Sequence, residues 1–311
     1  MEHNYCTIFS RDSLYKGLIL YDSLIKYDKS FCLFAICLEE DIRALLVSMN
    51  LPNMAVIGMS NIENEDYELA MARYNRNLKE FAWTAKAPMI LYIFKYYPDI
   101  PSLIYIDGDT KFFSSPLPIF QEFSNYSVML TRERFYIPDK DNMYRLYGSY
   151  NGGFLAFKRD HNAIEALQWF RKKCLQWCYN RSENGLYGDQ IYLDSLPKMF
   201  KNVVVTENIG INATAWHSHA SIIDKQNDVV RINNVPIIFY HYSGLVYYNL
   251  YQFELCFYID LPQNLINLIY VPYLMELRQK IWYVEQFRAN FYNSTIKIVQ
   301  NGFYRNYYQL L

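Results

Sequence analysis

The pattern that most constrains this fold is an alternation of short apolar runs with amphipathic helical periods. The runs are rich in β-branched and aromatic residues and predict buried strands at 31–37, 54–58, 103–106, 127–131, 153–157, 202–206 and 236–240. Between several of them, apolar residues step by three and four, clearest from Tyr67 to Phe81 and from Ala163 to Trp177. This alternation predicts an α/β fold with a mainly parallel sheet.

The C-terminal fifth of the chain has a different pattern. Past Gly244 the strand signal fades, and a helical, tyrosine-rich region runs to Leu311. One helix face is predicted by the spacing of Leu274, Leu277, Ile281, Val284 and Phe287. We expect a main domain over 1–245 and a helical C-terminal extension over 246–311 that packs on it.

Composition excludes several classes of protein. Thirty basic and 31 acidic residues leave a net charge of −1 with no Lys/Arg-rich run, so we expect no nucleic-acid partner. Residues 1–12 lack the basic head and apolar stretch of a signal peptide, and the longest uncharged stretch, 232–253, is too polar to span a bilayer. Six cysteines without a C-x-x-C pair indicate reduced thiols and no structural zinc. We therefore expect a cytoplasmic protein.

The segment that carries chemistry is the end of the predicted strand 103–106. It runs into Asp107-Gly108-Asp109, which places two carboxylates at the edge where parallel sheets bind ligands. Carboxylate oxygens suit Mn²⁺ or Mg²⁺, and Gly108 would let a diphosphate approach the backbone. Asp-Gly is also a common turn dipeptide. Asp139 and Asp141 have the same spacing without a strand before them, so we assign that pair no role.

A histidine follows another predicted strand. The run 236–240 leads into His241-Tyr-Ser-Gly244, and a parallel strand would deliver the imidazole to the same sheet edge. Histidine is a good Mn²⁺ ligand, although a lone one at a strand end is more often a hydrogen-bonded core residue. With the carboxylates nearby, we predict a metal site of Asp107, Asp109 and His241.

Two further segments place polar groups beside permissive backbone. Asn151 and Gly152 enter a predicted strand, and Asp189 with Gln190 opens a helix. The side chains could hydrogen-bond sugar hydroxyls while the glycine lets a donor lie close. The alternative readings are a β-bulge at the glycines and a helix N-cap at Asp189.

Taken in chain order, these segments resemble the motif series of glycosyltransferase family eight and related GT-A enzymes. The four are Asp107-Gly-Asp109, Asn151-Gly-Gly, Gly188-Asp-Gln190 and His241-Tyr-Ser-Gly244. Further segments, at 6–10, 80–84, 177–179 and 208–216, are similar to an uncharacterised set of bacterial nucleotide-diphospho-sugar transferases. The resemblance extends from about residue 5 to residue 245. It implies a GT-A fold, which is Rossmann-like with a mainly parallel sheet and helices on both faces.

The resemblance also implies roles for individual residues. Asp107 would contact donor and metal, Asp109 and His241 would bind Mn²⁺, and Asp189 and Gln190 would act at the transferring sugar. Lys86, or alternatively Arg76, would balance phosphate or sugar charge. The donor site would comprise Thr7, Ser10, Tyr15, Lys86, Asp107, Gly108, Asn151, Gly152 and Gly244, with the segment 7–15 at the nucleotide base. Trp216 and His217 would meet the acceptor.

Two positions depart from the families' patterns. Family eight continues after Gly244 with Lys-Pro-Trp, whereas this chain has Leu245-Val-Tyr247, so a basic residue that usually meets the diphosphate is missing. The bacterial group usually has Asn after the tryptophan, where this chain has His217. These changes concern diphosphate contact and acceptor geometry.

Together these features predict a metal-dependent glycosyltransferase. It would move a hexose from a UDP-sugar to a glycan or glycolipid acceptor with retention of configuration, unless Asp189 is the base of an inverting reaction. The alternatives are a nucleotidyltransferase or metal phosphohydrolase, for which residues 6–12 lack a glycine-rich phosphate loop, and a non-catalytic glycan-binding protein. The aromatic C-terminal region leaves open contact with the inner face of the membrane or a second subunit.

Overall fold

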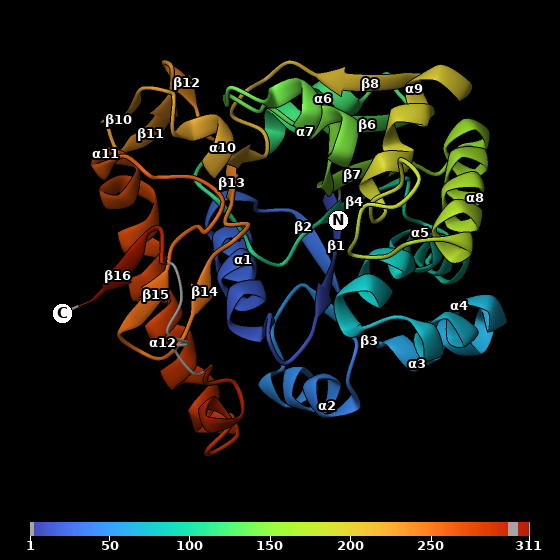
Figure 1. Cartoon of the computed structure of the whole chain (residues 1–311). Helices are drawn as coiled ribbons and strands as arrows, with labels where there is room; N and C mark the ends of the chain where they lie inside the picture. Colours follow the sequence, from blue (N-terminus) through green and yellow to red (C-terminus); the bar gives the residue numbers. More distant parts are fainter. Residues whose placement is uncertain (1–2, 298–303, 311) are drawn as a thin grey trace.

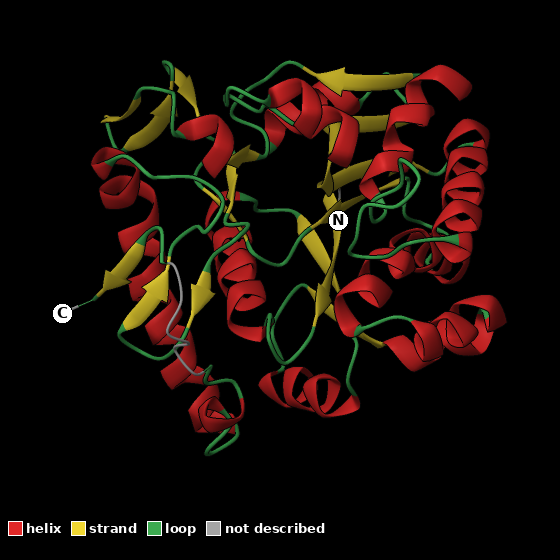
Figure 2. Cartoon of the chain, in the orientation of Figure 1, coloured by secondary structure: helices red, strands yellow, loops and turns green. Residues whose placement is uncertain are grey.

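The computed structural model describes residues 3–297 and 304–310, and its centre is a seven-stranded sheet (Figures 1 and 2). The strand order is β3-β2-β1-β4-β7-β6-β8. The strands are β1 (His3–Phe9), β2 (Phe31–Cys37), β3 (Met54–Gly58), β4 (Ser102–Ile106), β6 (Val128–Arg132), β7 (Tyr150–Lys158) and β8 (Val203–Thr206). Six of these match predicted runs. β1 was not predicted, because the polar His3, Asn4 and Thr7 interrupt its apolar pattern.

Strand β7 is antiparallel to both of its neighbours, β4 and β6, while the other neighbouring pairs are parallel. The mainly parallel sheet is therefore confirmed. The reversal has a functional consequence, since it puts the amino end of β7, with Asn151 and Gly152, at the edge where β4 ends. The backbone N–H of Asp107 donates to the carbonyl of Gly153 at 2.9 Å across this edge.

Both faces of the sheet are covered by helices. Alternate residues of the strands enter different hydrophobic clusters, as with Leu103 and Tyr105 on one face and Ile104 and Ile106 on the other. Helices α5 (Leu78–Tyr96) and α8 (His161–Gln176) pack on the first face, and α1 (Leu14–Tyr27) and α6 (Leu117–Phe123) on the second. Continuous apolar runs are the sequence pattern expected of strands buried in this way.

The helix predicted from Tyr67 to Phe81 is in fact two helices. Helix α4 (Tyr67–Ala72) is followed by the 3₁₀ turn η1 (Arg73–Asn75), and α5 then starts at Leu78. A capping box fixes that start, because Asn77 and Glu80 each bond the other's backbone N–H. As a result Tyr67 and Tyr74 are 75% and 85% exposed rather than on a buried face.

A second sheet lies beside the first, with the order β5-β13-β9. Its strands are β5 (Thr110–Phe112), β9 (Ala213–Thr214) and β13 (Phe239–His241), and β13 is antiparallel to β5. The expectation that the run 236–240 joins the main parallel sheet is therefore wrong. That sequence contributes instead to β12 (Val235–Pro236) and β13, after the hairpin β10 (Ile223–Gln226) and β11 (Val229–Ile232).

The C-terminal region contains both helix and sheet. Helix α12 (Val271–Phe287) packs along α1, and of the predicted face all but Phe287 is buried (Figure 1). The region also forms the sheet β14 (Val246–Tyr247), β15 (Gln252–Glu254) and β16 (Tyr307–Gln309), which the helical prediction missed. The domain boundary at 245 remains a prediction.

The other elements are short and mostly lie in connections. They are α2 (Glu40–Met49), α3 (Met59–Glu65), α7 (Lys140–Tyr147), η2 (Gln190–Ser195), α9 (Leu196–Met199), α10 (Ala215–Ser218), α11 (Gln263–Leu265), η3 (Ile266–Tyr270) and η4 (Tyr292–Ser294). Within the described ranges, no helix is long and apolar enough to cross a membrane. All six cysteines are free thiols.

Candidate active site

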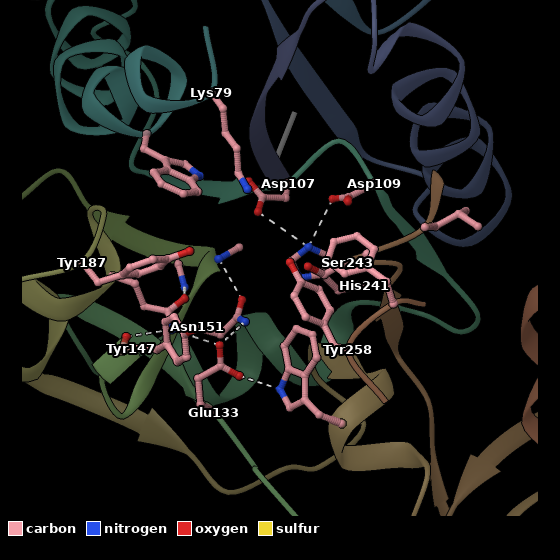
Figure 3. A pocket seen from close by; sticks show the side chains of 18 of the residues that line it. Lys79, Asp107, Asp109, Glu133, Tyr147, Asn151, Tyr187, His241, Ser243 and Tyr258 are labelled. Atoms are coloured by element: carbon pink, nitrogen blue, oxygen red, sulfur yellow. Dashed lines mark hydrogen bonds and ion pairs between the residues drawn. The ribbon is translucent and has the colours of Figure 1, made fainter. Parts of the chain in front are cut away.

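The three predicted metal ligands converge at the carboxyl end of β4 (Figure 3). The chain passes from β4 through Asp107-Gly-Asp109 directly into β5, and His241 pairs with Thr110 in the β5–β13 register. Nε2 of His241 lies 3.2 Å from Oδ1 of Asp109 and 3.7 Å from Oδ2 of Asp107. The predicted proximity is correct, but an antiparallel strand of the second sheet produces it.

The cluster is electrostatically suited to a cation. Burial would lower the pKa of His241, but the Asp109 and Asp107 carboxylates outweigh it and raise the pKa. Burial would raise the pKa of Asp109, but His241 and Lys16 outweigh it and lower the pKa. One ligand atom from each of the three residues lies within 4.8 Å of the others. Two carboxylate oxygens and an imidazole nitrogen could therefore hold a divalent ion.

A cavity of about 580 Å³ opens beside this cluster. Ten of the predicted site residues line it: Lys86, Asp107, Asp109, Asn151, Gly152, Asp189, Gln190, Trp216, His241 and Gly244. They come from α5, the β4–β5 turn, the start of β7, the entry into η2, α10, and β13 with the segment after it. The volume is typical of a site that encloses a small-molecule ligand.

Lys86 and Asp189 form a buried ion pair in the cavity wall. Nζ of Lys86 lies 2.7 Å from Oδ2 of Asp189 and donates to the carbonyl of Gly152 at 2.8 Å. Burial disfavours the ammonium, but Asp189 and Asp107 outweigh it and raise the pKa of Lys86, so the side chain stays charged. Asp189 occupies the N-cap position of η2, but its side chain makes no capping bond there and pairs with Lys86 instead. Arg76 lies elsewhere, bonded to the carbonyls of Cys174 and Leu175.

Glu133 organises several of the predicted residues, although sequence reasoning did not identify it. It is 4% exposed, and its carboxylate accepts from Asn151 Nδ2 at 2.7 Å, Gln190 Nε2 at 3.1 Å and Trp216 Nε1 at 2.7 Å. No described cation pairs with it, and burial raises the pKa of Glu133. Its position just after a predicted strand end was the available signal.

Lysines surround the cavity near the metal cluster. Lys16 of α1, Lys79 of α5 and Lys297 all line it, and Nζ of Lys16 donates to the carbonyl of Leu245 at 2.8 Å. Leu245 is the position at which family eight has its lysine. The ammonium of Lys16 therefore lies beside the position at which family eight has a lysine, although Lys16 belongs to α1. Burial lowers the pKa of Lys16, and Asp109 opposes that effect.

Aromatic side chains form other walls of the cavity. Tyr147 and Tyr187 lie on one side with their rings 4.6 Å apart, edge to face. Phe257 and Tyr258, from the C-terminal region, lie on another, and Tyr258 meets Trp216 edge to face at 5.9 Å. The C-terminal region thus supplies part of the site as well as packing on the core, and its aromatic faces are suited to sugar rings.

Five predicted residues are absent from the cavity lining. Tyr15 is buried against Tyr247 and Phe291, and Ser10 is hydrogen-bonded to Ser13. Thr7 is buried in β1, and Gly108 packs on β1, where a Cβ would lie 3.4 Å from the carbonyl oxygen of Ile8. That distance is an ordinary van der Waals contact, so packing on β1 does not by itself require a glycine, and the proposed role of Gly108 at a diphosphate stays a prediction.

His217 is also buried. Its ring stacks on Tyr136 at 5.4 Å and is 1% exposed, so only Trp216 of the predicted acceptor pair faces the cavity.

No family model matches the chain, but two curated relatives and many solved structures do. YfnF of Bacillus subtilis is 32% identical over 250 residues, which is 78% of this chain and 82% of YfnF. YfnD of the same organism is 30% identical over 281 residues, which is 89% of each chain. Both are uncharacterised.

Two solved glycosyltransferases have a similar fold. Galactosyltransferase LgtC, solved with donor and acceptor sugar analogues, aligns with a TM-score of 0.53 at 16% identity, over 78% of this chain and 87% of its own. Bifunctional glycosyltransferase WbbM aligns with a TM-score of 0.51 at 12% identity, over 89% of this chain and 51% of its own. The GT-A fold is therefore confirmed, and membership of family eight in particular stays a prediction.

Proposed function

The chain belongs to the same protein family as YfnF and YfnD and has the GT-A fold, and we propose that it is a metal-dependent glycosyltransferase that uses a nucleotide-diphosphate sugar. The observation that carries this proposal is one cavity that joins an Asp-Asp-His cluster, four lysines and the side-chain amides of Asn151 and Gln190. The lysines suit the diphosphate, the Asp-Asp-His cluster suits the cation and the amides suit the hydroxyls of the sugar.

Asp107, Asp109 and His241 would hold Mn²⁺ or Mg²⁺. The donor set fits such an ion, because it combines two hard oxygens with an imidazole around one point. A bound divalent cation would neutralise charge on the leaving diphosphate. Lys16 and Lys79 line the same cavity and would contact the phosphates, with Lys16 held at the carbonyl of Leu245.

The sugar would lie against Asn151, Gly152 and the Lys86–Asp189 pair. Both hydrogens of the Gln190 amide are used, by Glu133 and by the carbonyl of Tyr147, and its oxygen accepts from the backbone N–H of Gly152. Gln190 would therefore act mainly by fixing the backbone at Gly152. Only a remaining lone pair of its oxygen is available to the sugar.

We propose retention of configuration because each carboxylate of the cavity is already engaged. Asp107 and Asp109 belong to the metal cluster, Asp189 is paired with Lys86, and Glu133 accepts three hydrogen bonds. An inverting enzyme needs a free base on the acceptor side. Without one, the leaving diphosphate accepts the proton of the acceptor hydroxyl while the acceptor oxygen bonds the anomeric carbon from the same face.

Release of UDP from UDP-hexoses tests the proposal. With Mn²⁺, the full chain should release UDP slowly to water and faster with a glycan or glycolipid acceptor, and EDTA should stop both reactions. Release of hexose 1-phosphate, with UMP passed to an acceptor or to water, would instead indicate a nucleotidyl transfer or phosphohydrolase reaction. Donor binding without turnover for any hexose would indicate a non-catalytic sugar-binding protein. A β product from an α-linked donor, measured by NMR, would contradict retention.

A further inference from the structure

A second cavity of about 480 Å³ adjoins the proposed active site. It shares Glu133, Phe135 and Ile137 with the first cavity, and its other lining residues come from the end of β6 and the segment between β6 and β7. We call this second cavity the basic groove, because its lining includes Arg132, Arg134 and Lys140. Figure 3 shows Glu133 across the main cavity from Asp107, so the groove lies on the side away from the metal cluster.

The positive charge of the basic groove is mostly uncompensated. Lys140 has no side-chain partner among the residues described, and Arg134 has no carboxylate within ion-pair distance there. Arg134 is held by a bond from Nη2 to the carbonyl of Thr206 at 3.1 Å. Arg132 pairs with Glu207 at 3.0 Å, but that carboxylate is 75% exposed and its interaction is weak in water.

The groove lining holds one carboxylate, Glu133, whose charge offsets that of the cations only in part. Both oxygens of Glu133 are occupied by Asn151, Gln190 and Trp216. The hydroxyl of Tyr144 donates to the backbone carbonyl of Glu133 at 3.0 Å and so holds the wall between groove and cavity. The lining of the basic groove therefore contains three cations and one carboxylate.

We propose that the basic groove binds an anionic group of the phosphate class carried by the acceptor, and so holds the acceptor hydroxyl at the sugar site. This inference rests on the proposed transferase function. The groove shares the wall at Glu133 with the main cavity, so an acceptor held in the groove is next to the proposed sugar site. Guanidinium and ammonium groups are the usual ligands of phosphate esters. The phosphate could belong to a soluble glycan or to a lipid headgroup.

Protection of Lys140 from amine acetylation, read by mass spectrometry, tests the inference. The full chain is labelled with UDP and Mg²⁺ present, so that the main cavity is filled, and with phenyl phosphate or phosphatidylglycerol vesicles as the probe. Phosphatidylcholine vesicles serve as the neutral control, and exposed Lys201 is the internal control. Phenyl phosphate at a concentration of twice its Kd should slow the labelling of Lys140 about threefold and leave the labelling rate of Lys201 unchanged.

The outcomes separate the possibilities. Arg132→Gln, at an exposed side chain, should weaken the protection, and Lys201→Gln should not. Protection by phosphatidylglycerol vesicles but not by phenyl phosphate would assign the anion to a lipid headgroup. Equal labelling of Lys140 with and without both probes, or equal protection of Lys201, would overturn the inference. UDP binding is measured separately by thermal shift, and its absence would count against the transferase proposal instead.

Discussion

The indole N–H of Trp216 donates to Oε2 of Glu133 over 2.7 Å, on a carboxylate whose other oxygen already accepts from two amides. Glu133 therefore joins α10, β7 and η2, three elements that supply predicted site residues. A buried carboxylate without a cation is costly, and three hydrogen bonds of this kind are what stabilises it. We infer that Glu133 orients the amides and the indole around the sugar.

Glu133→Gln should reduce the kcat for UDP-sugar turnover about 10- to 100-fold, since an NH₂ group replaces one acceptor oxygen and leaves a buried donor facing another donor. The affinity for UDP should stay the same, because UDP lacks the hexose that is transferred. Steady-state kinetics and calorimetry of UDP binding measure the two effects. Wild-type kcat, or parallel loss of UDP binding, would contradict the assigned role.

The sequence predicted the parts of the site that depend on local pattern. Asp107 and Asp109 follow a strand marked by four apolar residues. Asn151 was predicted from a different pattern, a polar side chain beside glycines, and it reaches the same edge because β7 is antiparallel to β4. His241 was predicted for a partly wrong reason, because strand direction depends on pairing between distant segments. Glu133 was missed although it lies just after a predicted strand end. Lys16 could not be found, since a charged residue on an amphipathic helix has the same local pattern whether it faces solvent or a cavity. Only the packing of α1 beside Leu245 distinguishes them.

Asp109→Asn should abolish metal-dependent turnover, with a fall of at least about 100-fold, because one charged ligand of the cation is lost. The fold should persist, since the side chain is partly exposed at the sheet edge. Asp141→Asn is the matched control, because Asp141 belongs to a second D-x-D sequence, lies on α7 and does not line the cavity. Titration of Mn²⁺ followed by electron paramagnetic resonance measures binding directly. Unchanged Mn²⁺ affinity in the Asp109 variant would remove the metal assignment.

Lys86→Met should lower the free energy of unfolding by about 3–5 kcal/mol, because it leaves Asp189 buried without its cation. Adding Asp189→Asn to the same chain should recover part of that loss, since the unpaired charge is then gone. The double variant should still be inactive if the pair positions the sugar. Urea unfolding and UDP release together separate these effects. Recovery of activity along with stability would mean that the pair serves the fold alone.

Lys16→Met should weaken UDP binding about 10-fold and leave uridine binding unchanged, because the ammonium would contact only the phosphates. Lys26→Met is the control on the same helix, where the side chain is exposed over the ring of Tyr27. Calorimetry with the two ligands gives both affinities. Equal weakening of UDP and uridine would indicate a displaced α1 rather than a lost phosphate contact.

His217 should make the protein less stable in mild acid. Burial lowers the pKa of His217 to about 4, with Arg134 and His219 adding to the effect. A pKa below the unfolded value of about 6.5 means that the unfolded chain binds the proton first, so stability is full above that value and is lost as the pH falls toward the folded pKa.

Between pH 7.5 and pH 5, His217 should lower the free energy of unfolding by about 2 kcal/mol, and a His217→Asn variant should lose correspondingly less over the same interval. Urea unfolding at the two pH values measures the difference. Because the His217 ring stacks on Tyr136 in the basic groove wall, equal pH dependence in both proteins would show that this imidazole is protonated without cost and that the wall is open to water.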